Sequence, residues 1–409
     1  EVLNTNFGKE FHQRRMDYFY FFFHKSILLG KRNTVLTFIT TNYFLNATYA
    51  DKLRKDLFKN CEFTKLINFN EAKVFESATG QHNAISILKI GKNKNNFVET
   101  ALTSRKGILD GKTINDILHG NDKLTKSIKF LSSDIFEEPK YHILIEGLNG
   151  NSENLSANVL NSIKSRGKRL VDVVDIVQGI VSGANNLSPK YKVEYNIQKE
   201  EGSGILILQQ NEINNLNLNS FEKNILKPWF KNSDISKWIC NEETNQFVIY
   251  LTSKDEIDEN KIPNLLNHFK AFKPLLINRN VRTGRYTINN YTDFINNKFD
   301  IPYVMIKSSF KNGKYYLLSY SRDKYVFESP KIVCPQRSHL NTFAYTEKPW
   351  YGASDVYYIV ENKKNIINLK YVLSILNSKL IFFWLNNKCQ KKGEMLQLFK
   401  DPLSDIPMY

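Results

Sequence analysis

Helical and strand patterns alternate over the first ninety residues of this chain, and no other feature restricts its fold as strongly. Apolar side chains at three- and four-residue steps predict a helix over residues 11–29, which Gly30 is placed to end. The β-branched run Thr34–Thr40 predicts a strand buried on both faces, and further strands are predicted at Phe63–Phe69 and Ala84–Ile90. Alternation of this kind is typical of an α/β layer with a mostly parallel sheet.

A second helix is predicted between the first two strands, with Asn46 as its N-cap. From about residue 95 to residue 165 the pattern weakens into polar stretches, which indicates a connecting region of short elements. Short strands and Asn-containing turns follow, until an apolar stripe predicts a last long helix over Asn368–Asn386. A length of 409 residues indicates two or three domains.

The charge balance favours a polyanionic partner. The chain has 57 Lys and Arg against 41 Asp and Glu, a formal net charge of +16. Basic side chains that neutralise phosphates release condensed counterions, and here some of them cluster, as at Lys164–Arg169. The alternative is that the Lys- and Asn-rich composition simply reflects a biased genome. Charge alone does not separate DNA from RNA.

Several classes of protein find little support in the sequence. The longest apolar run, Tyr18–Phe23, is far shorter than the roughly 20 residues that span a bilayer. The four cysteines are scattered without a CxxC pair and the seven histidines are dispersed, so we expect free thiols in a reducing cytoplasm and no metal site. Glu-x-Lys triplets such as Glu71–Lys73 are common by chance and do not predict a nuclease. The chain begins with Glu and not with Met, so we expect its true N-terminus to lie upstream.

One constellation is more specific. The segment RMDYFYFFFHKSILLGKRNTVLTFITTNYFL (Arg14–Leu45) is followed by LINFN (Leu66–Asn70) and KVFESATGQHNAISILKI (Lys73–Ile90). This order resembles the gamma-class N6-adenine DNA methyltransferases of restriction–modification systems, of the TaqI-methyltransferase type. In that family the stretch lies just downstream of the catalytic Asn-Pro-Pro-Tyr/Phe tetrapeptide.

The resemblance continues into the second half. IVQGIVSGANN (Ile176–Asn186), LKPWFKNSDISKW (Leu226–Trp238), FESPKIVCPQRSHLNTFAY (Phe327–Tyr345) and KKGEMLQLFKDPLSDIPM (Lys391–Met408) resemble blocks of that family's target-recognition domain, in family order. The resemblance implies an α/β fold: the C-terminal half of a Rossmann-like methyltransferase sheet followed by a mixed α+β target-recognition domain. The implied domains are 1–100 for the C-terminal part of the catalytic domain, 101–165 for a connecting region and 166–409 for target recognition.

The sequence also departs from the family. Neither the Asn-Pro-Pro-Tyr tetrapeptide nor the Gly-rich turn that holds S-adenosyl-L-methionine occurs in these 409 residues. In the family both elements lie upstream of the part matched here. The resemblance therefore implies S-adenosyl-L-methionine as cofactor, in a pocket formed mostly by an upstream segment or a separate subunit. No catalytic residue is assigned within the chain.

The resemblance implies one residue that contacts the target base. Enzymes that modify a base in duplex DNA flip it out of the stack, and an aromatic residue then holds its face. The family position falls on Phe75, which lies between Val74 and polar residues. The alternative is a core phenylalanine at a strand end.

Candidate DNA contacts lie in the second half. Gln336 and Arg337 suit adenine and guanine edges, although they could equally brace the domain. The other candidates are a Gly-flanked loop, a basic loop and a charged block before the last motif, namely Ser182, Asn185 and Asn186, then Arg279, Arg282 and Arg285, then Lys391, Lys392 and Glu394.

These observations predict an adenine-specific DNA methyltransferase of a restriction–modification or defence system. It would transfer a methyl group from S-adenosyl-L-methionine to the exocyclic amino group of adenine in duplex DNA by base flipping. Two alternatives stay open: a non-catalytic DNA-specificity subunit, and an RNA-directed methyltransferase.

Overall fold

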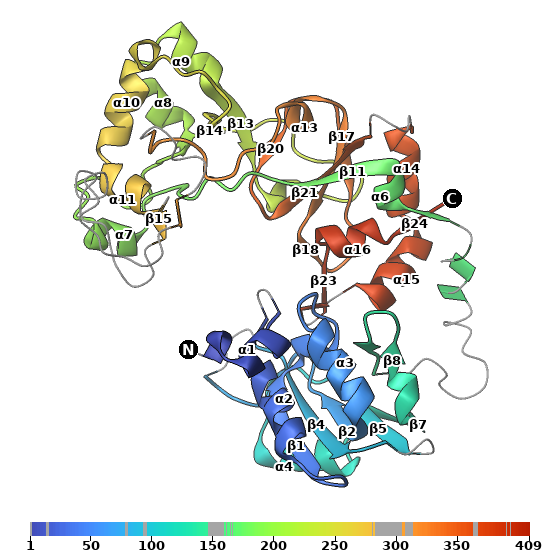
Figure 1. The fold of residues 1–409 in the computed structure, drawn as a ribbon. Coiled ribbons are helices and arrows are strands. Elements are labelled where there is room, and N and C mark those ends of the chain that lie inside the picture. The colour runs from blue at the N-terminus through green and yellow to red at the C-terminus, as the bar shows by residue number, and fades with distance from the viewer. Residues whose placement is uncertain are drawn as a thin grey trace. The chain divides into compact units, whose positions relative to one another are not determined.

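The computed structural model divides the chain into two compact units (Figure 1). The N-terminal unit comprises Glu1–Gly167 and Cys389–Gln397, and the C-terminal unit comprises Lys168–Lys388 and Leu398–Tyr409. The structure describes residues 2–13, 16–77, 81–92, 96–145, 159–160, 162–163, 165, 167–279, 281–282, 305–306, 314–362, 367–389, 391–392 and 394–409. Over these ranges no helix is both long and apolar enough to cross a bilayer.

A five-stranded sheet forms the centre of the N-terminal unit, in the order β1-β4-β2-β5-β7. Its strands are β1 (Val35–Thr41), β2 (Cys61–Asn68), β4 (Asn83–Ile90), β5 (Phe97–Thr103) and β7 (Thr125–Leu131). Of its four strand pairs only β2–β5 is parallel, so the prediction of a mostly parallel sheet is wrong for the described residues. β4 follows β2 through a connection whose described residues contain no helix, and such direct returns make neighbouring strands antiparallel.

The first strand is less buried than predicted. Val35 and Ile39 of β1 are 60% and 42% exposed, whereas Leu36 and Phe38 pack against the core. Exposed and half-buried residues alternate along β1, the edge strand of the sheet, so among the described residues only one of its faces is covered. The prediction of burial on both faces is therefore wrong.

Helices cover both faces of this sheet. α2 (Tyr20–Leu29) and α3 (Asp51–Asn60) lie on one face, and α4 (Gly111–His119) lies on the other (Figure 1). Adjacent residues of β2 show the two layers, because successive side chains of a strand point to opposite faces. Leu66 packs in the cluster that contains α2 and α3, and Ile67 packs with Ile117 of α4.

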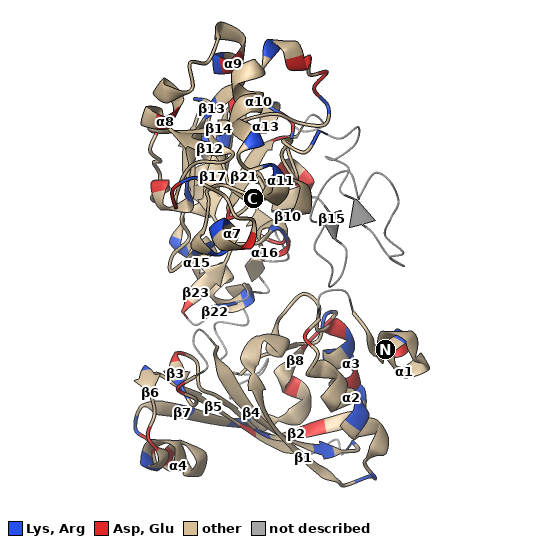
Figure 2. Ribbon diagram, turned by 90° about the vertical axis from the view of Figure 1, so that its left-hand side faces the viewer, with Lys and Arg blue, Asp and Glu red and all other residues tan. Residues whose placement is uncertain are grey.

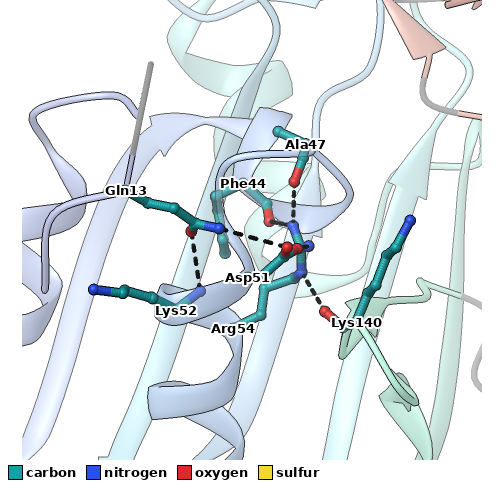
Figure 3. Close-up of polar contacts among 7 residues, drawn as sticks. All are labelled: Gln13, Phe44, Ala47, Asp51, Lys52, Arg54 and Lys140. Carbon is teal, nitrogen blue, oxygen red and sulfur yellow. Dashed lines mark hydrogen bonds and ion pairs between the residues drawn. The ribbon is translucent and has the colours of Figure 1, made fainter. Parts of the chain in front are cut away.

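Two helix predictions need correction. The helix predicted over 11–29 is shorter than expected, since α2 begins only at Tyr20 and the preceding helix α1 (Asn6–Phe11) overlaps the predicted range at Phe11 alone. The Gln13 side chain accepts a hydrogen bond from the backbone of Lys52 at 3.1 Å and donates to Asp51 at 3.5 Å, which holds this segment to another helix (Figure 3). Asn46 does not cap α3, whose N-cap residue is Ala50.

A buried arginine ties three segments of the N-terminal unit together (Figure 3). Arg54 is 0% exposed, and its guanidinium donates to the carbonyls of Phe44 and Lys140 at 3.0 Å each and of Ala47 at 2.7 Å. It also pairs with the Asp51 carboxylate one turn earlier in α3. Burial lowers the pKa of Arg54 to about 10, so the group is charged at neutral pH.

The C-terminal unit contains two four-stranded sheets, in the orders β11-β21-β17-β19 and β12-β14-β13-β20. The first consists of β11 (Val174–Gln178), β21 (Val356–Glu361), β17 (Lys331–Pro335) and β19 (Ala344–Thr346). The second consists of β12 (Ile207–Gln209), β14 (Gln246–Ile249), β13 (Leu226–Phe230) and β20 (Tyr351–Gly352). The two sheets and several short helices enclose a core with the buried rings of Trp229, Phe230 and Trp350.

The last predicted helix, Asn368–Asn386, is also two helices. Asn368 caps α14 (Leu369–Leu376), as expected from its position, and α15 (Lys379–Lys388) follows after a break. At the break Asn341 donates to the carbonyls of Leu376 and Ser378 at 2.7 and 2.9 Å. A side chain from another segment thus satisfies carbonyls that a continuous helix would use.

Shorter elements complete both units. The helices are α6 (Leu170–Val173), α7 (Pro189–Glu194), α8 (Gln210–Asn215), α9 (Ser220–Ile225), α10 (Pro263–Lys270), α11 (Lys273–Asn278), α13 (Tyr325–Glu328) and α16 (Lys400–Ser404). The strands are β3 (Ala72–Lys73), β6 (Gly107–Ile108), β8 (Phe136–Glu137), β9 (His142–Ile143), β10 (Lys168–Arg169), β15 (Val281–Arg282), β16 (Met305–Ile306), β18 (Arg337–Ser338), β22 (Lys391–Lys392), β23 (Met395–Gln397) and β24 (Pro407–Met408). A mixed α/β fold with several sheets is confirmed, whereas the Rossmann-like arrangement stays a prediction.

Candidate functional site

Three strands of the N-terminal unit end at one edge of its sheet. β1 and β2 are both antiparallel to β4, and β5 is parallel to β2, so all three run in the same direction. Their carboxyl ends, at Thr41, Asn68 and Thr103, therefore share an edge. In open α/β sheets ligands bind outside the carboxyl ends of strands, so this edge is a candidate binding site.

Polar side chains build the turn that follows β2. Asn42 donates to the side-chain oxygen of Asn68 at 2.9 Å, and the same oxygen accepts from the backbone of Asn70 at 3.0 Å. Asn70 has a φ of +49°, and its carbonyl lies 2.6 Å from the His82 ring. The local network thus fixes the path from the end of β2 into β3.

Phe75 lies just beyond this turn. β3 pairs in parallel with β6, which holds the backbone beside Phe75 against a second segment. Val74 packs on the small core beneath the turn, whereas the Phe75 side chain is 45% exposed. The alternative of a core phenylalanine does not fit this exposure. An accessible aromatic face next to the carboxyl-end edge has the geometry that base stacking needs.

A hairpin from near the end of the chain reaches the same turn. β22 and β23 form this hairpin, and it belongs to the N-terminal unit, whereas the family resemblance implies that residues 166–409 form the target-recognition domain. The Glu394 backbone donates to the Glu71 carboxylate at 2.6 Å, and the Glu394 carboxylate pairs with Lys106 at 2.8 Å. The predicted group Lys391, Lys392 and Glu394 is thereby brought to the segments that flank Phe75.

A cavity of about 350 Å³ lies beyond the carboxyl end of β5, and its lining is mostly polar. Arg105 donates to one oxygen of Asp122 at 3.0 and 2.6 Å, and this contact lowers the pKa of Asp122 to about 2. Asp110 caps α4 at the same place. These paired charges and the absence of a glycine-rich turn from the sequence do not fit S-adenosyl-L-methionine, so we assign the cofactor no site on these residues.

In the C-terminal unit the structure joins two of the predicted groups. Ser182 is buried and donates to the Asn185 side chain, while Asn186 donates to the carbonyl of Gly202 at 3.1 Å. The Arg279 guanidinium donates to the carbonyls of Ser182, Tyr315 and Leu317, the last at 2.6 Å. This geometry gives Arg279 a bracing role and leaves its guanidinium little freedom to reach a phosphate.

Burial of the Arg279 guanidinium lowers its pKa to about 9. The two other residues of the predicted basic loop cannot be compared with it. Arg282 ends β15, where only the backbone is described, and Arg285 lies outside the described residues.

Gln336 and Arg337 differ in their surroundings. The Gln336 backbone donates to the carbonyl of Asp355 at 2.7 Å and accepts from Leu398 at 2.8 Å, and its half-buried side chain bonds Tyr357. Arg337 is exposed. Bracing therefore suits Gln336, and contact with a ligand suits Arg337.

Sequence reasoning missed the polar residues that follow the strand ends, including Asn42, Asn68 and Arg105. Their position directly after apolar strands was an available signal, because side chains at the carboxyl ends of strands that run in the same direction gather at one edge. The Lys and Arg positions are spread over both units and interspersed with acidic ones (Figure 2). The net charge alone therefore does not locate a binding face.

Two family models match parts of the chain. Residues 2–75 match the Eco57I restriction-modification methylase, and residues 273–408 match the TaqI-like C-terminal specificity domain. The type II methyltransferase M.HindII of Haemophilus influenzae (strain ATCC 51907 / DSM 11121 / KW20 / Rd) is 26% identical over 423 residues, which cover 100% of this chain and 70% of that protein. M.HincII of Haemophilus influenzae is 25% identical over 419 residues, which cover 100% and 69%.

Among solved structures, the type IIL restriction-modification enzyme MmeI in complex with DNA aligns with a TM-score of 0.54 at 8% identity, over 94% of this chain and 40% of that chain. That alignment shows a shared fold and spans less than half of the larger enzyme. The family models and relatives confirm the expected similarity to restriction–modification methyltransferases and to a TaqI-like specificity domain.

Proposed function

We propose that this chain holds and recognises DNA in an adenine-specific DNA methyltransferase of a restriction–modification system. The methyl group would pass from S-adenosyl-L-methionine to the exocyclic amino group of a flipped adenine in duplex DNA. The exposed ring of Phe75, held beside the carboxyl ends of β1, β2 and β5, carries the proposal. The similarity to type II methyltransferases along the whole chain supports it.

Phe75 is proposed to stack on the extruded base. Flipping costs a few kcal/mol of unstacking, and stacking on an aromatic ring returns roughly 1–3 kcal/mol. A 45% exposed ring can meet a base without rearrangement of the core, because Phe69, Ala72 and Val74 anchor this turn in the apolar cluster beneath it. Phe75 would position the base and would not itself move a proton.

Phosphate contacts are proposed for Lys391, Lys392 and Arg337. The hairpin ion pair between Glu394 and Lys106 would hold the two lysines near the Phe75 turn. Contacts of this kind set the register of a protein on DNA and make binding weaken with salt. Ser182, Asn185 and Asn186 remain candidate contacts, with Ser182 limited by its burial.

The cofactor is proposed to be held mainly by a further α/β segment, supplied by an upstream part of the polypeptide or by a separate subunit. The edge strand β1 supports this proposal, because an uncharged edge with exposed apolar side chains invites pairing. Phe22, Leu29, Val35 and Ile39 are exposed on α2 and β1, from 42% to 73%. Packing of a neighbouring segment would cover them.

Sequencing of modified bases tests the proposal. DNA from cells that express the complete open reading frame should carry N6-methyladenine in one defined motif, and Phe75→Ala should lower its extent at least tenfold. The matched control is Phe97→Ala, which removes a ring that is 51% exposed at the start of β5. If no motif is methylated, the proposed methyltransferase activity is excluded. If Phe75→Ala methylates the motif to the same extent as Phe97→Ala, the proposed role of Phe75 is excluded.

A second candidate is a DNA-specificity subunit without catalysis, favoured by the missing tetrapeptide and glycine-rich turn. A chain of this kind would bind duplex DNA and leave adenine unmodified in every combination of segments tested. An RNA-directed enzyme would instead prefer structured RNA to duplex DNA in a titration at two salt concentrations.

A further inference from the structure

A tight turn in the C-terminal unit presents a tryptophan on a strained backbone. Ser236 donates to the carbonyl of Ile239 at 2.9 Å, and Ile235 and Cys240 form an antiparallel bridge below the turn. Trp238, at the tip, has a φ of +81°. Large side chains rarely adopt this conformation, and it persists only where the surroundings enforce it.

Two hydrogen bonds to another segment enforce it here. The Trp238 N–H donates to the carbonyl of Phe343 at 2.8 Å, and the Trp238 carbonyl accepts from Tyr345 at 3.4 Å. The backbone is thus fixed while the ring is 46% exposed. The other three tryptophans, Trp229, Trp350 and Trp384, are 0% to 5% exposed.

A second exposed segment begins beside this turn. The loop between Arg337 and Phe343 is anchored by Asn341, which binds the break between α14 and α15, and by Asn377, which binds the Phe343 backbone. Its tip carries Leu340, which is 52% exposed, and Ile239 on the tryptophan turn is 69% exposed. Leu340 is three positions before Phe343 in the chain, so both tips lie within roughly 10 Å of one anchor.

The charges around these tips favour a polyanion. Lys237 lies 6.0 Å from the Trp238 ring, and Arg337 and His339 are exposed on the neighbouring loop. Two of the acidic residues that flank the turn in sequence are engaged elsewhere. The Asp234 carboxylate accepts from the backbone N–H of Lys231 at 2.7 Å and from the Asn241 side chain at 3.0 Å, and Glu242 forms an ion pair with Lys348 at 2.9 Å.

We infer that Trp238 is a DNA contact that stacks against a base pair opened by the enzyme, with Lys237 and Arg337 on the adjacent phosphates. The inference rests on the proposed function and adds a DNA-distorting residue to it. Extrusion of a base exposes the faces of its neighbours in the stack, and an aromatic side chain can cover such a face. A rigid backbone spares the entropy of ordering the tip on binding.

The difference in tryptophan fluorescence between the wild-type 409-residue chain and its Trp238→Phe variant isolates the signal of Trp238. Acrylamide should quench Trp238 in the free chain, and a short duplex that carries the methylated motif should protect it. Trp238→Ala should weaken binding of that duplex about tenfold and reduce the fluorescence rise of 2-aminopurine placed beside the target adenine. Trp238→Phe, which keeps a ring, should bind within roughly threefold of wild type, a difference below 1 kcal/mol.

Phe221→Ala is the matched control. Phe221 is 47% exposed and has Lys261 at 5.9 Å from its ring, but it lies in the helix α9. This variant should bind like wild type. Trp238→Gly removes the ring and relieves the positive φ, so it should melt no lower than wild type and still lose the affinity.

The inference is overturned if Trp238→Ala and Trp238→Gly bind the duplex as Phe221→Ala does, or if DNA leaves Trp238 open to acrylamide. The inference is overturned as well if Trp238→Ala weakens binding of structured RNA but not of the duplex. Failure of the wild-type chain to bind any duplex would instead remove the proposed function, and the inference with it.

Discussion

Replacement of Arg54 by Met tests whether one buried guanidinium holds the N-terminal unit together. Methionine keeps most of the aliphatic volume but leaves the carbonyls of Phe44, Ala47 and Lys140 without this donor and removes the ion pair with Asp51. A buried polar group left without its hydrogen bond costs about 1–3 kcal/mol, so we expect the three carbonyls together to cost roughly 3–5 kcal/mol, whereas the Asp51 side chain is 39% exposed and adds little. For a unit of this size each kcal/mol lowers the melting temperature by about 2–4 °C, so we expect a fall of roughly 10 °C.

The matched control is Arg169→Met. Arg169 also pairs with an aspartate three residues away, Asp172, but its side chain is 61% exposed, and such surface pairs contribute about 0–1 kcal/mol. Thermal unfolding followed by circular dichroism measures the fall in melting temperature for each variant. Hydrogen exchange of peptides that cover α3 shows whether Arg54→Met destabilises that helix locally. If Arg54→Met melts within about 2 °C of Arg169→Met, the three carbonyl contacts do not stabilise the unit and the reasoning is refuted.

Two further predictions concern acid and cofactor. Asp122 has a folded pKa of about 2 against about 3.9 in an unfolded chain, so its contribution to the free energy of unfolding is complete above pH 4 and is lost as the pH falls toward 2. Urea unfolding between pH 2 and 5 should show this loss in wild type and a weaker slope in Asp122→Asn; equal slopes would contradict it. Calorimetric titration with S-adenosyl-L-methionine should show millimolar or weaker binding to the 409-residue chain and tighter binding to the complete reading frame. Micromolar binding by the chain alone would refute our view of the polar cavity beside Arg105.

Strand positions could be predicted from the sequence, because apolar β-branched runs mark them locally. β1, β2 and β4 lie within two residues of the predicted runs. Strand direction could not be predicted, since it depends on which strands become neighbours, and β4 inserts between β1 and β2. The non-helical backbone at Gln13 could not be predicted either, because the contacts that hold it come from Asp51 and Lys52, which are distant in sequence.

In the candidate site, too, local features could be predicted from the sequence and long-range contacts could not. The exposure of Phe75 was predictable from its polar neighbours in sequence, and the structure agrees with that exposure. The approach of Glu394 to Glu71 joins residues more than three hundred positions apart, and no local pattern encodes it. Arg279 has the composition of a phosphate contact, yet its three carbonyl partners come from segments that the sequence could not bring together.

The hairpin at residues 389–397 has a consequence for engineering new specificities. Because it belongs to the N-terminal unit, the chain passes from one unit to the other at 167/168, 388/389 and 397/398. A chimera joined only at 167/168 would take this hairpin from the donor and set a foreign loop against Glu71 and Lys106. Grafts that retain the host's residues 389–397 should therefore tolerate exchange of the rest, and the hairpin defines which short stretch must evolve together with the N-terminal unit.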